Sequence, residues 1–189
     1  SSAASDVYKR QLLDLMKKTE QMQGLSVHAH GLAVIESYKN LIDDLNNGKE
    51  VIDPIITTIY EKLKDKILPD EITLRYQEFH DCGKPLCLYF DEEGRRHFPD
   101  HANISYNIWK QLFPQEIEVQ ELIKHDMDFH TLKGEELDKL WNSRLAPTLY
   151  FTAWAEIIAN SKMFGGFDST SFKIKKKKLI QAGKKYLNK

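Results

Sequence analysis

Histidines and acidic residues are the side chains of this sequence whose types and spacing could do chemistry. The 189 residues include seven histidines, and two of these are followed directly by aspartate, at His80-Asp81 and His125-Asp126. One such pair carries little weight, because seven histidines meet a neighbouring aspartate fairly often. Imidazoles and carboxylates that converge from several helices are nevertheless how helical bundles build metal sites.

The spacing of the histidines indicates which of them turn inward. His30 lies on the apolar face of its predicted helix, whereas His28 points well away from that face. His101 begins the apolar face of a later helix, and His125 lies one turn beyond an apolar position. A core histidine bonded to a backbone carbonyl is the commoner explanation for any one of them. Several inward histidines on successive helices favour a site instead.

One acidic residue, Glu156, lies within the otherwise apolar segment LYFTAWAEIIA. Burying a carboxylate has a high free-energy cost unless a cation or hydrogen-bond donors meet it, and buried ionisable groups concentrate at functional sites. We therefore predict that Glu156 points inward. The alternative is that it points outward between Trp154 and Ile157 or pairs with a lysine.

The elements that must position these residues are predicted to be helices, so the expected fold class is all-α. Apolar residues recur at spacings of three and four along most of the chain, and no stretch shows convincing strand alternation. Gly83 and Pro85 predict the end of a helix that carries His80 and Asp81 in its last turn. The polar segment DEEGRRHFPD is interpreted as a loop or a small hairpin.

The length predicts one domain with a substantial core, over residues 12–172. The last segment, residues 173–189, contains eight lysines and no acidic residue, and is interpreted as a basic C-terminal helix or tail. Residues 1–172 are left with 19 basic and 28 acidic residues, a net charge of −9. Such a basic segment is more often a solvated helix end than a nucleic-acid contact, but it would attract RNA.

The first eleven residues, SSAASDVYKRQ, show no apolar periodicity, and DVYKRQ resembles translated adapter sequence from library preparation. Residues 1–11 are therefore predicted to be a non-native or disordered leader, in which case the native start and any upstream domain lie outside this sequence. No apolar run approaches the ~18 residues that a membrane span needs. The two cysteines are too few for a disulfide framework, which predicts a reducing, cytoplasmic setting.

The order of these residues resembles a known family. His30 is followed by the segments FHDCGKP, FPDHANIS, ELIKHD and AWAEIIA, in the order of the motifs of the HD superfamily of metal-dependent phosphohydrolases. The resemblance spans about residues 25–165. Within the superfamily it is greatest to the HD domain attached to bacterial tRNA nucleotidyltransferases and to related phage or RNA-repair proteins. One departure is Glu156, which stands where the family has its last metal-binding aspartate.

The resemblance implies an HD-domain bundle of about six to eight helices and a site for one divalent metal ion. The implied ligands are His30, His80, Asp81 and Glu156. This mixture of nitrogen and oxygen ligands suits manganese, nickel, cobalt, iron or magnesium, and does not choose among them. Such an ion polarises a phosphoryl oxygen and lowers the pKa of a bound water.

The remaining site residues are also implied by the resemblance. Asp81 would orient the attacking water, and Lys84 would offset charge on the phosphate. An ordinary exposed lysine is the alternative for Lys84. His101 and His125 would bind a second ion or contact the substrate phosphate.

The function that the resemblance implies is that of a phosphomonoesterase or 2′,3′-cyclic phosphodiesterase acting on nucleotides or RNA ends. Two alternatives come from other functional classes. A degenerate HD domain would bind RNA or a protein partner without catalysis, as the change to Glu156 favours. A site with two irons would perform oxygen chemistry on a small polyol or phosphonate.

Overall fold

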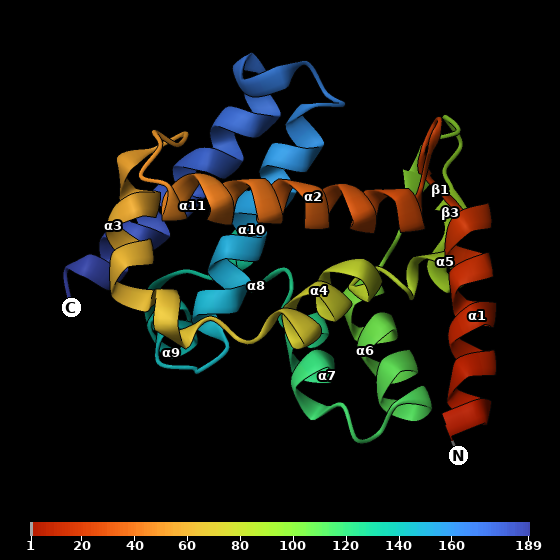
Figure 1. Cartoon of the computed structure of the whole chain (residues 1–189). Coiled ribbons are helices and arrows are strands. Elements are labelled where there is room, and N and C mark those ends of the chain that lie inside the picture. Colours follow the sequence, from red (N-terminus) through yellow and green to blue (C-terminus); the bar gives the residue numbers. More distant parts are fainter. Residues whose placement is uncertain (1) are drawn as a thin grey trace. The chain divides into compact units, whose positions relative to one another are not determined.

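The computed structural model describes residues 2–189, and it is all-α, as predicted (Figure 1). The strands found in this part of the chain form two short antiparallel hairpins. None of the helices within residues 2–189 has both the length and the apolar character needed to cross a membrane. The contacts within the chain define two compact units. The first contains the residues up to Ala33 and Asp70–Asp126, and the second contains Val34–Pro69 and Met127–Lys189.

The first unit contains both hairpins and the helices around them. Its elements are α1 (Ser2–Lys18), β1 (Glu20–Met22), β2 (Leu25–Ser26), the start of α2 (Val27–Asn46), α4 (Asp70–Phe79), α5 (Lys84–Cys87), β3 (Tyr89–Phe90), β4 (Arg96–His97), α6 (His101–Leu112) and α7 (Ile117–Lys124).

The core of the first unit is built around the indole of Trp109 on α6. Its ring centroid lies 4.8 Å from that of Phe79 and 4.4 Å from that of Phe113. The indole N–H donates a hydrogen bond of 2.8 Å to Glu116, which also pairs with Arg75 at 2.9 Å. These contacts join the C-terminal end of α4 to α6 and α7.

The second unit contains the remaining helices. Its elements are the rest of α2, α3 (Pro54–Leu63), the 3₁₀ turn η1 (Lys64–Lys66), α8 (Asp128–Thr131), α9 (Gly134–Trp141), α10 (Ala146–Ser161), the 3₁₀ turn η2 (Gly166–Asp168) and α11 (Thr170–Leu187).

Helix α11 contains most of the basic segment, so this segment is a helix to Leu187. Its apolar side packs within the second unit, where α10 and α11 lie against each other (Figure 1). The Tyr150 hydroxyl donates to the carbonyl of Leu179 at 3.0 Å, and the Trp141 indole donates to that of Ala182 at 2.9 Å. Buried aromatic donors thus hold α11 by its backbone.

The N-terminal segment is helical in the structure, although residues 1–11 are predicted to be a non-native or disordered leader. Helix α1 begins at Ser2, and it is anchored by Leu12 and Met16, which are 6% and 0% exposed. These two apolar side chains lie one turn apart, so they bury one face of the helix. The origin of residues 1–11 stays a prediction.

The two hairpins differ in whether the sequence predicts them. The segment interpreted as a loop or small hairpin, residues 91–100, contains β4, which pairs with β3 just before the segment, so that Tyr89 lies opposite His97. The β1–β2 hairpin, in which Glu20 pairs with Ser26, is not predicted from the sequence. Its strands contain three and two residues, too few to show a period of two.

Candidate metal centre

Asp81 is a buried carboxylate of the first unit, in the turn that follows α4. Asp81 is 2% exposed to solvent. Its Oδ2 lies 3.2 Å from Nε2 of His80, 3.8 Å from Nε2 of His30 and 2.7 Å from Nζ of Lys84. Its Oδ1 lies 3.5 Å from Nε2 of His101. Side chains from α2, the turn after α4, α5 and α6 therefore converge on one carboxylate.

Backbone carbonyls orient two of these imidazoles. Nδ1 of His80 lies 2.8 Å from the carbonyl oxygen of Gln77, and Nδ1 of His101 lies 3.1 Å from that of Phe98. A carbonyl oxygen can only accept, so Nδ1 must carry the hydrogen in both rings. Nε2 therefore faces Asp81 in both rings: the protonated ring donates to the carboxylate, and the neutral ring would offer its lone pair to a metal.

The donor atoms fit a divalent metal ion. His30 and His80 are buried, their rings lie 5.4 Å apart between centroids, and they offer ligand atoms within 4.8 Å of each other. With Asp81 they provide two nitrogens and one carboxylate, a donor set that manganese, iron, cobalt and nickel accept. His30 and His80 are therefore candidate ligands for such an ion.

Two glycines allow the backbones that carry these ligands to approach closely. A Cβ at Gly31 would lie 2.6 Å from the carbonyl oxygen of Glu78, where the start of α2 meets the end of α4. A Cβ at Gly83 would lie 2.5 Å from the backbone nitrogen of Ser105 on α6. The Gly83 N–H also donates a hydrogen bond of 2.8 Å to the Ser105 hydroxyl. Close contact of α2, the turn and α6 brings their histidines together.

The charges around Asp81 keep it ionised. Burial raises the pKa of this carboxyl group. This effect is outweighed by the charges of His80 and Lys84, by a hydrogen bond with His80 and by the charge of His30, all of which lower the pKa. The resulting pKa lies well below the usual range of an aspartate. Asp81 is therefore ionised at neutral pH, as a carboxylate ligand of a metal must be.

Lys84 is buried, and so differs from an ordinary exposed lysine. It is 8% exposed, and its ammonium donates to Asp81 at 2.7 Å and to Gln21 at 3.1 Å. Its Nζ also lies 5.2 Å from the ring centroid of Phe98. The ammonium is therefore held beside the carboxylate.

The second HisAsp pair is arranged differently from the first. His125 is half-exposed, and its Nε2 lies 3.7 Å from Oε2 of Glu121. Asp126 is instead the buried member, and it accepts a hydrogen bond of 2.5 Å from Tyr76. The Tyr76 ring lies edge-on to His80. A catalytic role for His125 stays a prediction.

Glu156 lies on α10 in the second unit, and its side chain is 14% exposed. Its Oε2 lies 3.6 Å from Nε2 of His130 on α8. His130 is not predicted as a site residue from the sequence, because the four-residue helix that carries it is too short to show apolar periodicity. The role of Glu156 as a metal ligand stays a prediction.

The fold and the centre define an all-α protein with a candidate divalent-metal site. Comparisons with protein-family models, with curated proteins and with solved structures found no match. The resemblance to the HD superfamily therefore rests on the sequence motifs alone.

Proposed function

We propose that this chain is a metal-dependent phosphoric ester hydrolase of the HD type. The supporting observation is the convergence of three imidazoles and one ammonium on the buried carboxylate of Asp81. The proposed ligands of one divalent ion, which is manganese, nickel, cobalt, iron or magnesium, are His30, His80, Asp81 and Glu156. The proposed substrates are phosphomonoesters or 2′,3′-cyclic phosphates of nucleotides or RNA ends, as the resemblance implies.

The bound metal would supply Lewis-acid polarisation of the phosphoryl group and activation of water. Asp81 would orient the attacking water, because its two oxygens face different groups of the site. Lys84 would offset charge on the phosphate. The side chain of His101 is 21% exposed, against 2% for His80. The side of the site that is open to substrate is therefore that of His101, which suits contact with the phosphate. His125 is proposed as a further substrate contact.

The first experiment is a hydrolysis assay on 2′,3′-cyclic nucleotides and a small panel of nucleoside phosphates, with each candidate metal added in turn. We expect metal-dependent turnover that falls to background in Asp81→Ala and in His30→Ala. The matched control is His28→Ala, two residues earlier on α2, because His28 pairs with Glu78 at 3.1 Å. This variant should retain turnover, whereas equal loss in both histidine variants would contradict the proposed ligand set.

A second candidate function is a binding module that has lost catalysis. It is favoured by the 2.7 Å pair between Lys84 and Asp81, which already balances the buried carboxylate, and by glutamate at position 156 in place of the family's aspartate. Calorimetric titration with each metal separates the two functions. Absence of both metal binding and turnover in the folded protein would favour the binding module.

A further inference from the structure

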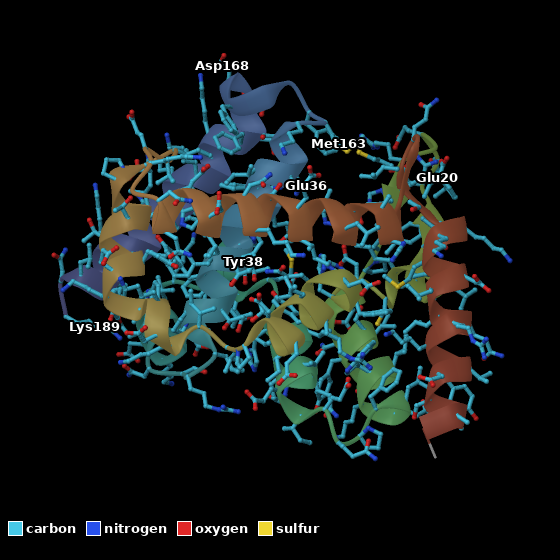
Figure 2. All side chains as sticks on the ribbon, in the orientation of Figure 1. Glu20, Glu36, Tyr38, Met163, Asp168 and Lys189 are labelled. Atoms are coloured by element: carbon cyan, nitrogen blue, oxygen red, sulfur yellow. The ribbon has the colours of Figure 1, made fainter. Side chains whose placement is uncertain are left out.

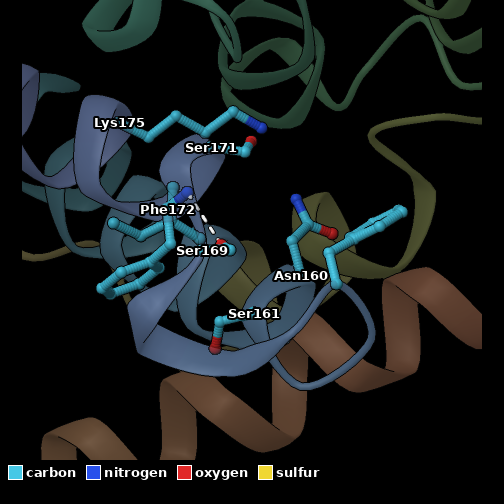
Figure 3. Close-up of a pocket in the computed structure, with 8 residues that line it drawn as sticks. Asn160, Ser161, Ser169, Ser171, Phe172 and Lys175 are labelled. Atoms are coloured by element: carbon cyan, nitrogen blue, oxygen red, sulfur yellow. Dashed lines mark hydrogen bonds between the residues drawn. The ribbon is translucent and has the colours of Figure 1, made fainter.

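A pocket of about 200 Å³ lies between the end of α10 and the start of α11, within the second unit. Figure 3 shows Asn160 from α10 and Ser171 and Lys175 from α11 around this hollow. Ile157, Phe164 and Phe172 provide apolar surface. The pocket thus combines an apolar wall with an amide, a hydroxyl and an ammonium, which suits a flat ring that has polar edges and a nearby negative charge.

The segment beside this pocket exposes large apolar side chains. Phe164 and Phe167 are 53% and 51% exposed, and Ile174 is 54% exposed. Met163 lies on the same connection between α10 and α11 (Figure 2). The ring of Phe167 packs on the buried ring of Phe172, with their centroids 4.8 Å apart. Exposed rings interleaved with lysines are typical of surfaces on which single-stranded nucleic acids stack their bases.

A row of lysines continues from the pocket along α11. Lys175, Lys178 and Lys185 follow at helical spacings of three and seven, so they share one face over about 15 Å. Lys178 and Lys185 line a second pocket of about 190 Å³, together with Lys133. Lys185 pairs with Asp138 at 3.2 Å, while Lys175 has no acidic partner among the residues that the structure describes. Lys175 and Lys178 therefore have charge available for phosphates, whereas the charge of Lys185 is shared with Asp138.

We propose that this face of the second unit binds single-stranded RNA. One base would stack on Phe164 and bond its edge to Asn160 and Ser171, and the phosphates would follow Lys175, Lys178 and Lys185. The proposal deepens the proposed function and rests on its choice of RNA as substrate. The RNA strand would be held by residues that are not proposed ligands of the metal.

A membrane surface is the competing partner for a basic helix with exposed apolar residues. Helices that bind bilayers insert their apolar face, but the apolar face of α11 is already used. Phe172, Leu179 and Ala182 are 5%, 0% and 2% exposed. The exposed apolar side chains instead gather at one end of the helix, beside a pocket with polar edges. This arrangement favours a nucleic acid.

The test is fluorescence anisotropy with a short labelled single-stranded oligouridine. Phe164→Leu keeps an apolar side chain but removes the aromatic face, and should weaken binding between about 5-fold and about 150-fold. Lys175→Ala should lower the slope of log affinity against log salt by about 0.7. Phe164→Trp should bind at least as well as the parent. The matched controls are Phe90→Leu, an exposed ring of the first unit, and Lys62→Ala on α3, and both should bind like the parent.

Two further measurements separate this inference from the proposed function. Asp81→Ala should lose turnover and still bind the oligonucleotide, because Asp81 is not among the residues that line this face. Hydrolysis of mononucleotides without oligonucleotide binding would overturn the inference alone. Equal binding by the parent, Phe164→Leu and Lys175→Ala would also overturn it, as would sedimentation with phosphatidylserine vesicles in place of oligonucleotide binding.

Discussion

Lys84 and Asp81 are the closest charged pair of the candidate metal centre, and both are buried. Removing one partner of such a pair leaves a charge without compensation, which costs about 3 to 5 kcal/mol. We expect Lys84→Met to lower the free energy of unfolding of the metal-free protein by about 3 kcal/mol, near the lower end, because His80 and His30 still face the carboxylate. Urea denaturation at neutral pH measures this loss.

The pH dependence of the same variant follows from the lowered pKa of Asp81. A carboxylate whose folded pKa is depressed stabilises the fold above its unfolded pKa and loses this contribution as the pH falls through the folded value. The difference between Lys84→Met and the parent should therefore shrink as the medium becomes acidic. The double variant Asp81→Asn, Lys84→Met is the control, and it should be less destabilised than Lys84→Met at neutral pH. A pH-independent difference would contradict the charge argument.

The two cysteines should differ in reactivity, because only the thiolate attacks a disulfide reagent. Burial raises the pKa of Cys82 to about 12, and its side chain is 0% exposed. The pKa of Cys87 is also raised by burial, but this thiol is only partly buried. Ellman's reagent at mildly alkaline pH should modify one thiol in the native protein and the second only after unfolding. In Cys87→Ser the native signal should vanish, and a signal that persists would show that Cys82 is accessible.

At the scale of elements, the approach of α6 to the turn after α4 depends on Gly83. Alanine there would place a Cβ against backbone atoms of Ser105 and Ile104, which cannot rotate away. Overpacking of this kind costs about 1 to 3 kcal/mol, and contact with backbone puts Gly83→Ala near 3 kcal/mol. Thermal denaturation measures the loss. Gly48→Ala, at φ 65° in open space, is the comparison, and should cost only the ~1 kcal/mol of a left-handed residue.

The elements of this chain differ in how well the sequence predicts them. Long amphipathic helices repeat their apolar spacing over several turns, so the helices that carry His30 and His101 could be predicted with the inward face of each histidine. His80 and Asp81 follow α4 instead of lying in its last turn. The inward orientation of Asp126 rather than His125 depends on its bond with Tyr76. Contacts between residues far apart in sequence, such as this one, leave no periodic signal.

At the scale of the whole molecule, the division into two units bears on which residues hold a metal. The sequence predicts one domain over residues 12–172, and the structure contains two compact units formed from alternating parts of the chain. His30, His80 and Asp81 belong to the first unit, whereas Glu156 belongs to the second. If all four residues are ligands, a bound metal should stabilise parts of both units.

Hydrogen exchange with and without manganese tests this prediction on the intact chain. A ligand that binds only the folded state stabilises it by about 2.7 kcal/mol at 100 times its Kd. If Glu156 is the fourth ligand, amides of α10 should gain protection together with those beside His30 and His80, and Glu156→Gln should remove the gain from α10. The control variant His28→Ala should keep both gains. Protection confined to the first unit in the parent would mean that Glu156 is not a ligand and that the metal is held by His30, His80 and Asp81 alone.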